Sequence, residues 1–284
     1  MTSSHFADRL QARIADTSPV CVGLDPQIRK LPSGLDHSPE GVAQFCHGII
    51  DATHDIAACV KPNLAFFELL GWEGMKIFWD ICAYAQSKKL LVIADGKRGD
   101  IGSTAEAYAE GYLHENAAVD ALTVHPYHGS DGIRPFIDVA ARNGKGVYVL
   151  VKTSNASAGE LQDLPCGDEA VHEHLAQLVE SWGAAHFGPK TNLSCVGAVV
   201  GATYPEELKY LRTLMPHCPF LIPGYGAQGG TAADVARGFI PDGTGAVVSA
   251  SRSIIQASGG SDWQDAARKA AETMAAELRK VLSA

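Results

Sequence analysis

The sequence predicts an α/β fold, a (β/α)8 barrel formed by a single domain, and three observations support this prediction. Short runs rich in β-branched residues alternate with longer amphipathic stretches, as expected for parallel α/β folds. The runs are nearly continuously apolar rather than alternating, which is typical of strands covered on both faces. Eight such runs occur in 284 residues, and one barrel typically takes about 250 residues.

The expected strands are Val20–Leu24, Ala58–Lys61, Leu90–Asp95, Ala121–His125, Gly146–Lys152, Cys195–Gly201, Phe220–Gly224 and Gly245–Ala250. The expected helices include Gly41–Ile56, Trp72–Ser87, Ile133–Asn143, Glu169–His186, Pro205–Met215 and Asp262–Leu282. Two stretches, Pro26–Pro39 and Ala156–Gly167, are predicted to be surface insertions in a domain that spans residues 1–284. The alternative, a doubly wound sheet, would favour Gly-x-Gly-x-x-Gly after an early strand, whereas Gly-Leu-Asp-Pro follows the first.

Composition limits the compartment and the partners. The chain is 46% hydrophobic and 19% charged, which excludes a disordered protein, and its net charge of −9 argues against nucleic-acid binding. No apolar run approaches the roughly 20 residues of a membrane helix, and the first residues do not resemble a signal peptide. The seven cysteines are scattered without a Cys-x-x-Cys pair and are expected to pack as free thiols. We therefore expect a cytoplasmic protein without nucleic-acid or membrane partners.

Charged residues gather where the third strand ends, in Asp95-Gly-Lys97-Arg-Gly-Asp100. In a barrel of this class the catalytic groups lie at the carboxyl ends of the strands. Residues two apart on an extended segment point to the same side, so Asp95 and Lys97 should face the barrel mouth together. Asp25 and Lys61 end neighbouring strands, and Asp100 is expected to open the following helix.

These charges indicate acid–base chemistry rather than solvated strand ends. A lysine between carboxylates keeps its proton, because nearby negative charge favours the ammonium form. Lys97 is therefore a poor Schiff-base nucleophile and a plausible general acid. Asp95 beside it would face any anionic group of a substrate, which is unfavourable in the ground state.

A second cluster predicts a phosphate site. The seventh strand runs into Pro-Gly-Tyr-Gly-Ala-Gln-Gly-Gly, whose glycines Gly224, Gly226, Gly229 and Gly230 let the backbone approach a ligand closely. Thr231 is expected to open a helix with free N–H groups, and Arg252 follows the adjacent last strand. Loops after the seventh and eighth strands are the usual phosphate site of this barrel.

His125 and His128 follow the fourth strand and could suggest a metal site. No third ligand is placed by the sequence, and the pair lies in a loop rather than on one helix face. Packing or support of the site is the favoured interpretation, and no metal is predicted.

Six segments in order resemble orotidine 5′-phosphate decarboxylase, in its longer bacterial form. They are Val-Gly-Leu-Asp25-Pro, Lys61-Pro-Asn-Leu-Ala-Phe-Phe-Glu, Asp95-Gly-Lys97-Arg-Gly-Asp100-Ile-Gly-Ser-Thr104, Thr-Ser154-Asn, Pro-Gly-Tyr-Gly-Ala-Gln228-Gly-Gly and Ser-Arg252-Ser-Ile. The third segment is highly specific, and together the six span nearly the whole chain. The resemblance implies a cofactor-free carboxy-lyase that converts orotidine 5′-phosphate to UMP and CO₂ in pyrimidine biosynthesis.

The resemblance also implies roles for individual residues. Lys97 would protonate C6 of the pyrimidine, Asp95 would lie near the departing carboxylate, and Lys61 would link this network to the ribose. Asp100 would act across a two-fold interface in a homodimer, with Thr104 close by. The implied substrate-binding residues are Asp25 at the ribose, Ser154 at the pyrimidine edge, and Gln228, Gly229 and Arg252 at the phosphate.

One departure from the family pattern and two alternatives stay open. The family often has Asn-Pro where this chain has Asn155-Ala156, and proline would preset that loop. A related barrel enzyme, a sugar-phosphate decarboxylase or aldol enzyme, would use a similar acid–lysine pattern with Mg²⁺. A barrel that only binds nucleotides and regulates a partner belongs to another class, but it would have no need for the complete set of Asp95, Lys97 and Asp100.

Overall fold

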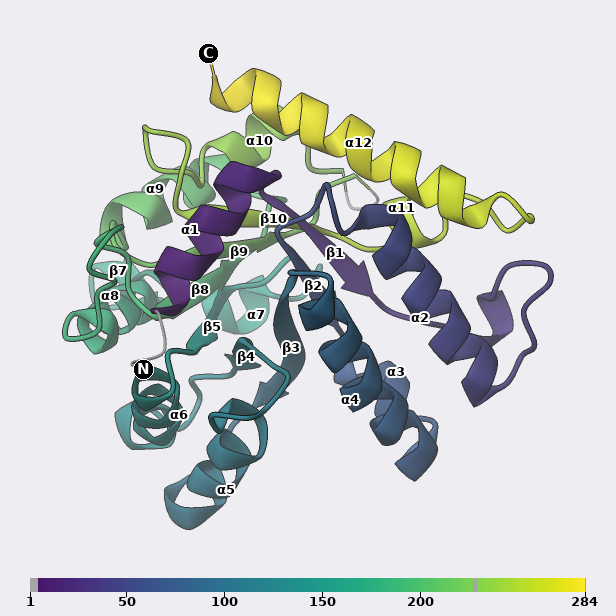
Figure 1. Ribbon diagram of the computed structural model, residues 1–284. Helices are drawn as coiled ribbons and strands as arrows, with labels where there is room; N and C mark the ends of the chain where they lie inside the picture. The colour runs from purple at the N-terminus through teal and green to yellow at the C-terminus, as the bar shows by residue number, and fades with distance from the viewer. Residues whose placement is uncertain (1–4, 227–228, 284) are drawn as a thin grey trace.

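Eight parallel strands close into a barrel, which confirms the predicted fold class (Figure 1). The computed structural model describes residues 5–226 and 229–283. The barrel strands are β1 (Val20–Leu24), β2 (Cys59–Pro62), β3 (Leu91–Arg98), β4 (Ala121–Val124), β5 (Gly146–Lys152), β8 (Val196–Val200), β9 (Phe220–Pro223) and β10 (Ala246–Ala250). They pair in the order β1-β10-β9-β8-β5-β4-β3-β2 and back to β1. Every expected strand is present, within three residues at either end.

Helices surround the barrel and cover the outer faces of the strands (Figure 1). They are α1 (Phe6–Asp16), α2 (Pro39–Thr53), α3 (Leu64–Glu68), α4 (Gly71–Ser87), α5 (Gly102–Leu113), α6 (Ser130–Arg142), α7 (Gly159–Gln162), α8 (Val171–Gly183), α9 (Pro205–Leu214), α10 (Ala232–Ala236), α11 (Arg252–Ile255) and α12 (Trp263–Leu282), with a 3₁₀ turn η1 at Ile28–Lys30. Their apolar stripes pack against the strands in one large buried cluster, as amphipathic helices of this fold require. No described helix is long and apolar enough to cross a membrane.

Helix α1 was not among the expected helices, and it covers the amino-terminal end of the barrel. Phe6 and Leu10 are buried and belong to the same cluster as the side chains inside the barrel. The Phe6 ring meets the Tyr148 ring edge-on, with 6.0 Å between centroids. Because this end is filled by apolar side chains, a ligand can enter only from the opposite end of the barrel.

Two boundaries at the carboxyl ends of the strands differ from expectation. Asp100 does not open the helix after β3: α5 begins at Gly102, and Ile101 is the residue before it. The Asp100 carboxylate instead accepts a hydrogen bond from the backbone N–H of Ile101 at 2.8 Å. The helix expected from Glu169 begins at Val171, because Glu169 pairs in a short hairpin.

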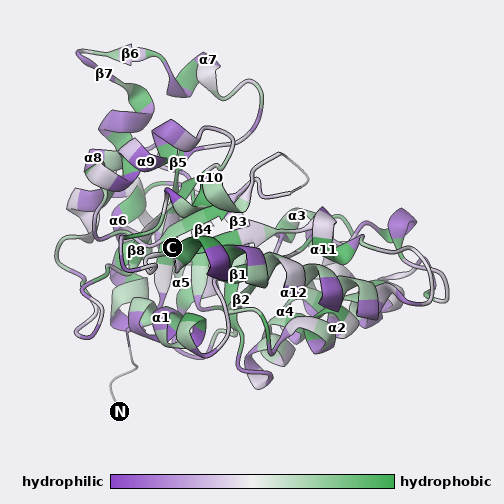
Figure 2. Cartoon of the chain, turned by 90° about the horizontal axis from the view of Figure 1, so that it is seen from above, coloured by the Kyte–Doolittle hydropathy of each residue, from purple (hydrophilic) through white to green (hydrophobic). Residues whose placement is uncertain are grey.

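The two expected insertions carry small elements of their own. The stretch 26–39 holds η1, and the stretch 156–167 holds α7 and strand β6 (Pro165–Cys166), which pairs antiparallel with β7 (Glu169–Ala170). Figure 2 shows α7 and this hairpin projecting from the end of the barrel opposite to α1. The second insertion therefore lies at the end where a ligand can enter.

The cysteines are free thiols, as expected, and all but Cys166 are buried. Cys21 and Cys59 lie side by side on β1 and β2. Burial raises the pKa of most of these thiols, including that of Cys46, so they behave as packing residues.

Candidate active site

A cavity of about 380 Å³ lies at the carboxyl ends of the barrel strands. Of the residues predicted for the site, Lys61, Asp95, Lys97 and Ser154 line it. The remaining lining residues are Thr123, Leu150, Thr153, Asn155, Val199, Leu221 and Pro223. Charged groups thus occupy the side formed by β2 and β3, while apolar side chains of β5, β8 and β9 face them. Such a site suits a partly apolar ligand that carries charge on one side.

Asp95 bridges two lysines on that charged side. One carboxylate oxygen accepts from Lys61 Nζ at 2.7 Å and the other from Lys97 Nζ at 2.5 Å. The Asp95 and Lys61 side chains are about 90% buried, whereas the Lys97 side chain is 51% exposed to the cavity mouth. Of these three charged side chains, Lys97 is therefore the one that a ligand can reach.

The charges of the bridge Lys61–Asp95–Lys97 stabilise one another. Burial alone would raise the pKa of Asp95, but the ammonium groups of Lys61 and Lys97 hold that pKa well below its usual range. Burial would lower the pKa of Lys61, but Asp95 and then Asp25 raise it above its ordinary value. Asp95 and Lys61 are therefore both charged at neutral pH.

Asp25 follows β1 and lies close enough to influence Lys61. One of its carboxylate oxygens is buried and has no hydrogen-bond partner among the described residues. A buried carboxylate oxygen without a partner is costly, so this position suits a hydroxyl donor from a ligand.

Asp95 and Lys97 face the same cavity, as expected, but a distortion of the strand places them there. The pairing of β3 with β4 shifts between Ala94 and Arg98, and Lys97 has a φ of +45°, in the left-handed region. A Cβ at Gly96 would lie 2.6 Å from the Leu64 Cδ1 methyl group, so a larger residue between the two charged ones would have to displace that side chain. Backbone strain of this kind is typical of functional sites.

Thr123, near the end of β4, holds this distortion in place. Thr123 was not among the site residues expected from the sequence. Its hydroxyl accepts from the backbone N–H of Lys97 at 2.9 Å and donates to Asp95 at 3.1 Å. The available signal was a polar residue inside the apolar run Ala-Leu-Thr-Val, at the carboxyl end of an expected strand.

Asp100 lies on the segment that leads into α5 and Thr104 lies on α5 itself, where it is exposed. The exposed apolar residues Ile101 and Tyr108 lie on the same segment. Neither Asp100 nor Thr104 is among the residues that line the cavity, so the structure leaves Asp100 outside the group formed by Lys61, Asp95 and Lys97.

The expected phosphate loop follows β9. Gly224, Gly226 and Gly229 all have positive φ values, and a side chain at Gly230 would clash with the Gly224 carbonyl at 2.8 Å. Arg252 begins α11 directly after β10, with its side chain exposed, and the neighbouring Ser253 lies close to Gly226. The predicted residue Gln228 lies outside the described residues.

The helix after this loop begins as expected but is already capped. Thr231 is the residue before α10, and its backbone N–H donates to the Asp234 carboxylate at 2.9 Å while its own hydroxyl accepts from the Asp234 N–H at 3.2 Å. Two N–H groups that we expected to be free are thus engaged, because Asp234 completes a capping box. The loop glycines and Arg252 remain as the candidate phosphate ligands.

His125 and His128 pack on each other, with 5.4 Å between ring centroids. A side chain at Gly99 would collide with the His125 ring at 2.3 Å, so this histidine packs against the segment that carries Lys97 and Asp100. This geometry supports the packing interpretation.

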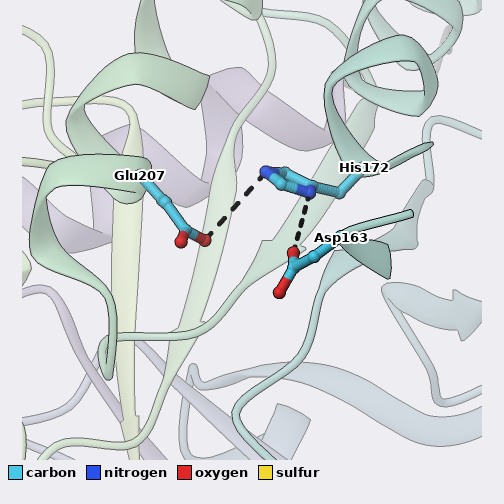
Figure 3. A group of neighbouring side chains, drawn as sticks. All are labelled: Asp163, His172 and Glu207. Atoms are coloured by element: carbon cyan, nitrogen blue, oxygen red, sulfur yellow. Dashed lines mark ion pairs between the residues drawn. The ribbon is translucent and has the colours of Figure 1, made fainter. Parts of the chain in front are cut away.

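Another group of side chains that could bind a metal ion lies outside the cavity lining and consists of Asp163, His172 and Glu207 (Figure 3). One ligand atom from each lies within 4.8 Å of the others. The Lys152 ammonium forms ion pairs with both carboxylates, so a cation of the protein itself already neutralises the group. No sequence pattern points to this cluster, because its members come from the insertion, from α8 and from α9.

The fold and this site define an enzyme of the (β/α)8-barrel class with a carboxylate that bridges two lysines at the barrel mouth. The chain belongs to the orotidine 5′-phosphate decarboxylase / HUMPS family, whose model matches residues 18–270. It is 43% identical to orotidine 5′-phosphate decarboxylase of Rhodopirellula baltica, over 96% of this chain and 99% of the relative. It is 38% identical to the Clostridium perfringens enzyme of the same name, over 98% of this chain and 99% of the relative.

A solved structure gives the same result. OMP decarboxylase of Leishmania donovani superposes with a TM-score of 0.82 at 33% identity, and the match covers 99% of each chain. These relatives are carboxy-lyases, and the prediction of an enzyme of this class is confirmed.

Proposed function

We propose that the protein converts orotidine 5′-phosphate to UMP and CO₂, with Lys97 as the proton donor to C6. The observation that carries this proposal is the bridge Lys61–Asp95–Lys97 at the wall of the cavity. It presents one accessible ammonium group next to a fixed carboxylate. The names of the relatives with 37–43% identity support the choice of substrate.

The reaction breaks the bond between C6 and the carboxylate carbon, and the electron pair stays on C6 as CO₂ leaves. The Lys97 ammonium then gives a proton to C6, and the resulting amine regains one from water. No carbonyl adjacent to C6 delocalises the charge. Catalysis must therefore come from preorganised charge and from binding energy spent away from the reacting bond. The left-handed backbone at Lys97 and the hydrogen bonds of Thr123 supply such preorganisation.

The remaining residues are assigned to binding. Asp25, with its unpartnered buried oxygen, would accept hydrogen bonds from the ribose hydroxyls. Ser154, between the cavity-lining Thr153 and Asn155, would read the pyrimidine edge. Arg252, Gly229 and Gln228 would hold the phosphate.

The active form would be a homodimer in which Asp100 and Thr104 of each subunit reach the site of the other. The exposed apolar residues Ile101 and Tyr108 lie on the same segment as these two polar residues, and Leu69 and Trp72 are more than 75% exposed nearby in the α3–α4 turn. Apolar exposure of this kind marks interaction surfaces.

The free thiols are compatible with a cytoplasmic enzyme.

The test is the loss of ultraviolet absorbance when orotidine 5′-phosphate is added, with EDTA present. Wild-type protein should turn the substrate over, and Lys97→Ala should lose at least about a thousandfold in kcat, since both the proton donor and one charge of the bridge are removed. A wild-type protein that is inactive under these conditions contradicts the proposal.

The same assay separates the two alternatives. Activity that EDTA abolishes and Mg²⁺ restores would favour a metal-dependent sugar-phosphate enzyme. Tight binding of UMP without any turnover would favour a nucleotide-binding regulator.

A further inference from the structure

Lys152 is the last residue of β5 and carries a charge into a buried position. Its side chain is 1% exposed, and its ammonium pairs with Asp163 and lies 3.2 Å from an oxygen of Glu207. The Tyr204 ring lies beside it, 5.0 Å from Nζ to the centroid. Burial lowers the pKa of Lys152, but the two carboxylates outweigh this effect and raise it above its ordinary value. A charge so placed stabilises the folded form only while both partners stay close.

The two carboxylates come from different parts of the chain. Asp163 directly follows α7 in the insertion 156–167, and Glu207 lies in the first turn of α9. His172, at the start of α8, completes the group: its Nδ1 lies 2.8 Å from the Gln162 carbonyl and 3.3 Å from Asp163 (Figure 3). Lys152 thus fastens the insertion to the barrel.

Gln162 connects this group to the cavity. Its amide oxygen accepts from the backbone N–H of Thr153 at 2.9 Å, and its amide nitrogen donates to the Thr153 hydroxyl at 2.7 Å. That hydroxyl in turn donates to the Asn155 side chain at 2.6 Å. Thr153, Ser154 and Asn155 line the cavity that also holds Lys97. A continuous path of contacts therefore leads from Lys152 to the wall of the candidate site.

We propose that Lys152, Gln162, Asp163, His172 and Glu207 form a clamp, the β5 clamp, in which Lys152 is a positioning residue that holds residues 153–155 in their substrate-binding arrangement. The inference rests on the proposed function and gives the insertion 156–167 a role. It also accounts for Ala156, since a loop without proline needs another device to fix it.

The expected effect falls on substrate affinity rather than on the chemical step. Residues 153–155 follow β5, which β4 separates from β3, so their disorder leaves the lysine bridge intact. When only a fraction of molecules has the binding arrangement, the apparent dissociation constant rises by the inverse of that fraction. A clamp that is closed one tenth of the time would raise KM about tenfold.

The central variant is Lys152→Met, which keeps the length of the side chain and removes the charge. We expect KM for orotidine 5′-phosphate and the dissociation constant of UMP to rise about tenfold, with kcat within about threefold of wild type. Lys152→Arg keeps the charge and should restore both constants to within about threefold. Lys88→Met is the control, because it removes an exposed ion pair with Asp51 on α2.

Gln162→Met tests the same path without touching the ion pairs and keeps the proposal testable if Lys152→Met does not fold. Like Lys152→Met, this variant should raise KM for orotidine 5′-phosphate. Amide hydrogen exchange of the segment 153–155 should be faster in both variants than in the wild type and in Lys88→Met, and saturating UMP should slow it again.

Three outcomes would overturn the clamp. One is an active wild type with unchanged KM in Lys152→Met and Gln162→Met; another is a lower melting temperature of these variants without any change in KM or exchange. The third is a fall in kcat at constant KM. Failure of the decarboxylase proposal itself is distinguishable, because the wild type would then be inactive while hydrogen exchange still reports on the clamp.

Discussion

The backbone N–H of Lys97 donates a hydrogen bond to the hydroxyl of Thr123, 2.9 Å away, and this contact holds the candidate proton donor in a left-handed conformation. Few side chains could replace it, because the same hydroxyl also donates to Asp95. A residue of the fourth strand thus fixes the geometry of two residues of the third.

Thr123→Val should therefore impair catalysis without removing a charged group. The valine has nearly the same shape, but it leaves the Lys97 N–H unpaired and takes one donor from Asp95. We expect kcat to fall about ten- to a hundredfold, which corresponds to one or two lost hydrogen bonds of about 1–3 kcal/mol. Steady-state kinetics measure this loss, and Thr123→Ser, which keeps the hydroxyl, should stay near wild type. Equal rates for the valine and serine variants would show that the hydroxyl has no such role.

Asp95→Asn tests electrostatic stress between this carboxylate and the carboxylate of the substrate. The variant should lower kcat, because the bridge loses its anion, and it should bind a carboxylate-bearing nucleotide inhibitor more tightly than the wild type does. UMP, which lacks that carboxylate, is the control ligand, and its affinity should increase less in the variant than that of the inhibitor. Weaker inhibitor binding together with lost activity would count against stress.

Subunit complementation tests whether Asp100 acts across an interface. Lys97→Ala and Asp100→Asn should each be nearly inactive as homodimers. In an equal mixture that has exchanged subunits, half of the dimers are mixed, and each of these contains one site with both native residues. Activity should therefore recover to about a quarter of the wild-type value. No recovery despite proven subunit exchange, or full activity of a monomer, would place Asp100 in its own subunit's site.

Lys145 gives a prediction for stability against pH. This buried lysine donates to the carbonyls of Ala117 and Val119, with Asp120 and Arg9 nearby, and burial lowers its pKa to about 8. The folded state then binds fewer protons than the unfolded state between pH 8 and the ordinary lysine value near 10.5. The Lys145 contribution to the free energy of unfolding should therefore rise with pH across that interval and stay flat below it.

The measurement is the difference in the free energy of unfolding between wild type and Lys145→Met, by urea titration at pH 7, 8, 9 and 10. Subtracting the variant removes the titration of other lysines and tyrosines, and the difference should move in favour of the wild type by roughly 1–3 kcal/mol over that range. A difference that is independent of pH would mean that Lys145 stays charged throughout.

The sequence located the strands well and the helices less completely. Continuous apolar runs identify buried strands because the pattern needs only a few residues, and β1 and β5 have the predicted bounds. Helix α5 has weak amphipathic character, with small residues such as Ala105 and Ala109 on its buried face, so its pattern gave little signal. Helix α1 lies before the first strand, outside the strand–helix alternation that guided the prediction.

For the site, the sequence supplied the residue types and the strand ends, and with them Lys61, Asp95 and Lys97. These residues could be found because each follows an apolar strand, and in a parallel barrel all carboxyl ends meet at one mouth. Only the tertiary structure decided that Asp95 bridges both lysines, that Thr123 holds the left-handed Lys97, and that Lys152 ties the insertion to residues 153–155. The physical reason is that these contacts join residues up to 34 positions apart through atoms within about 3 Å, and no local pattern encodes such distances.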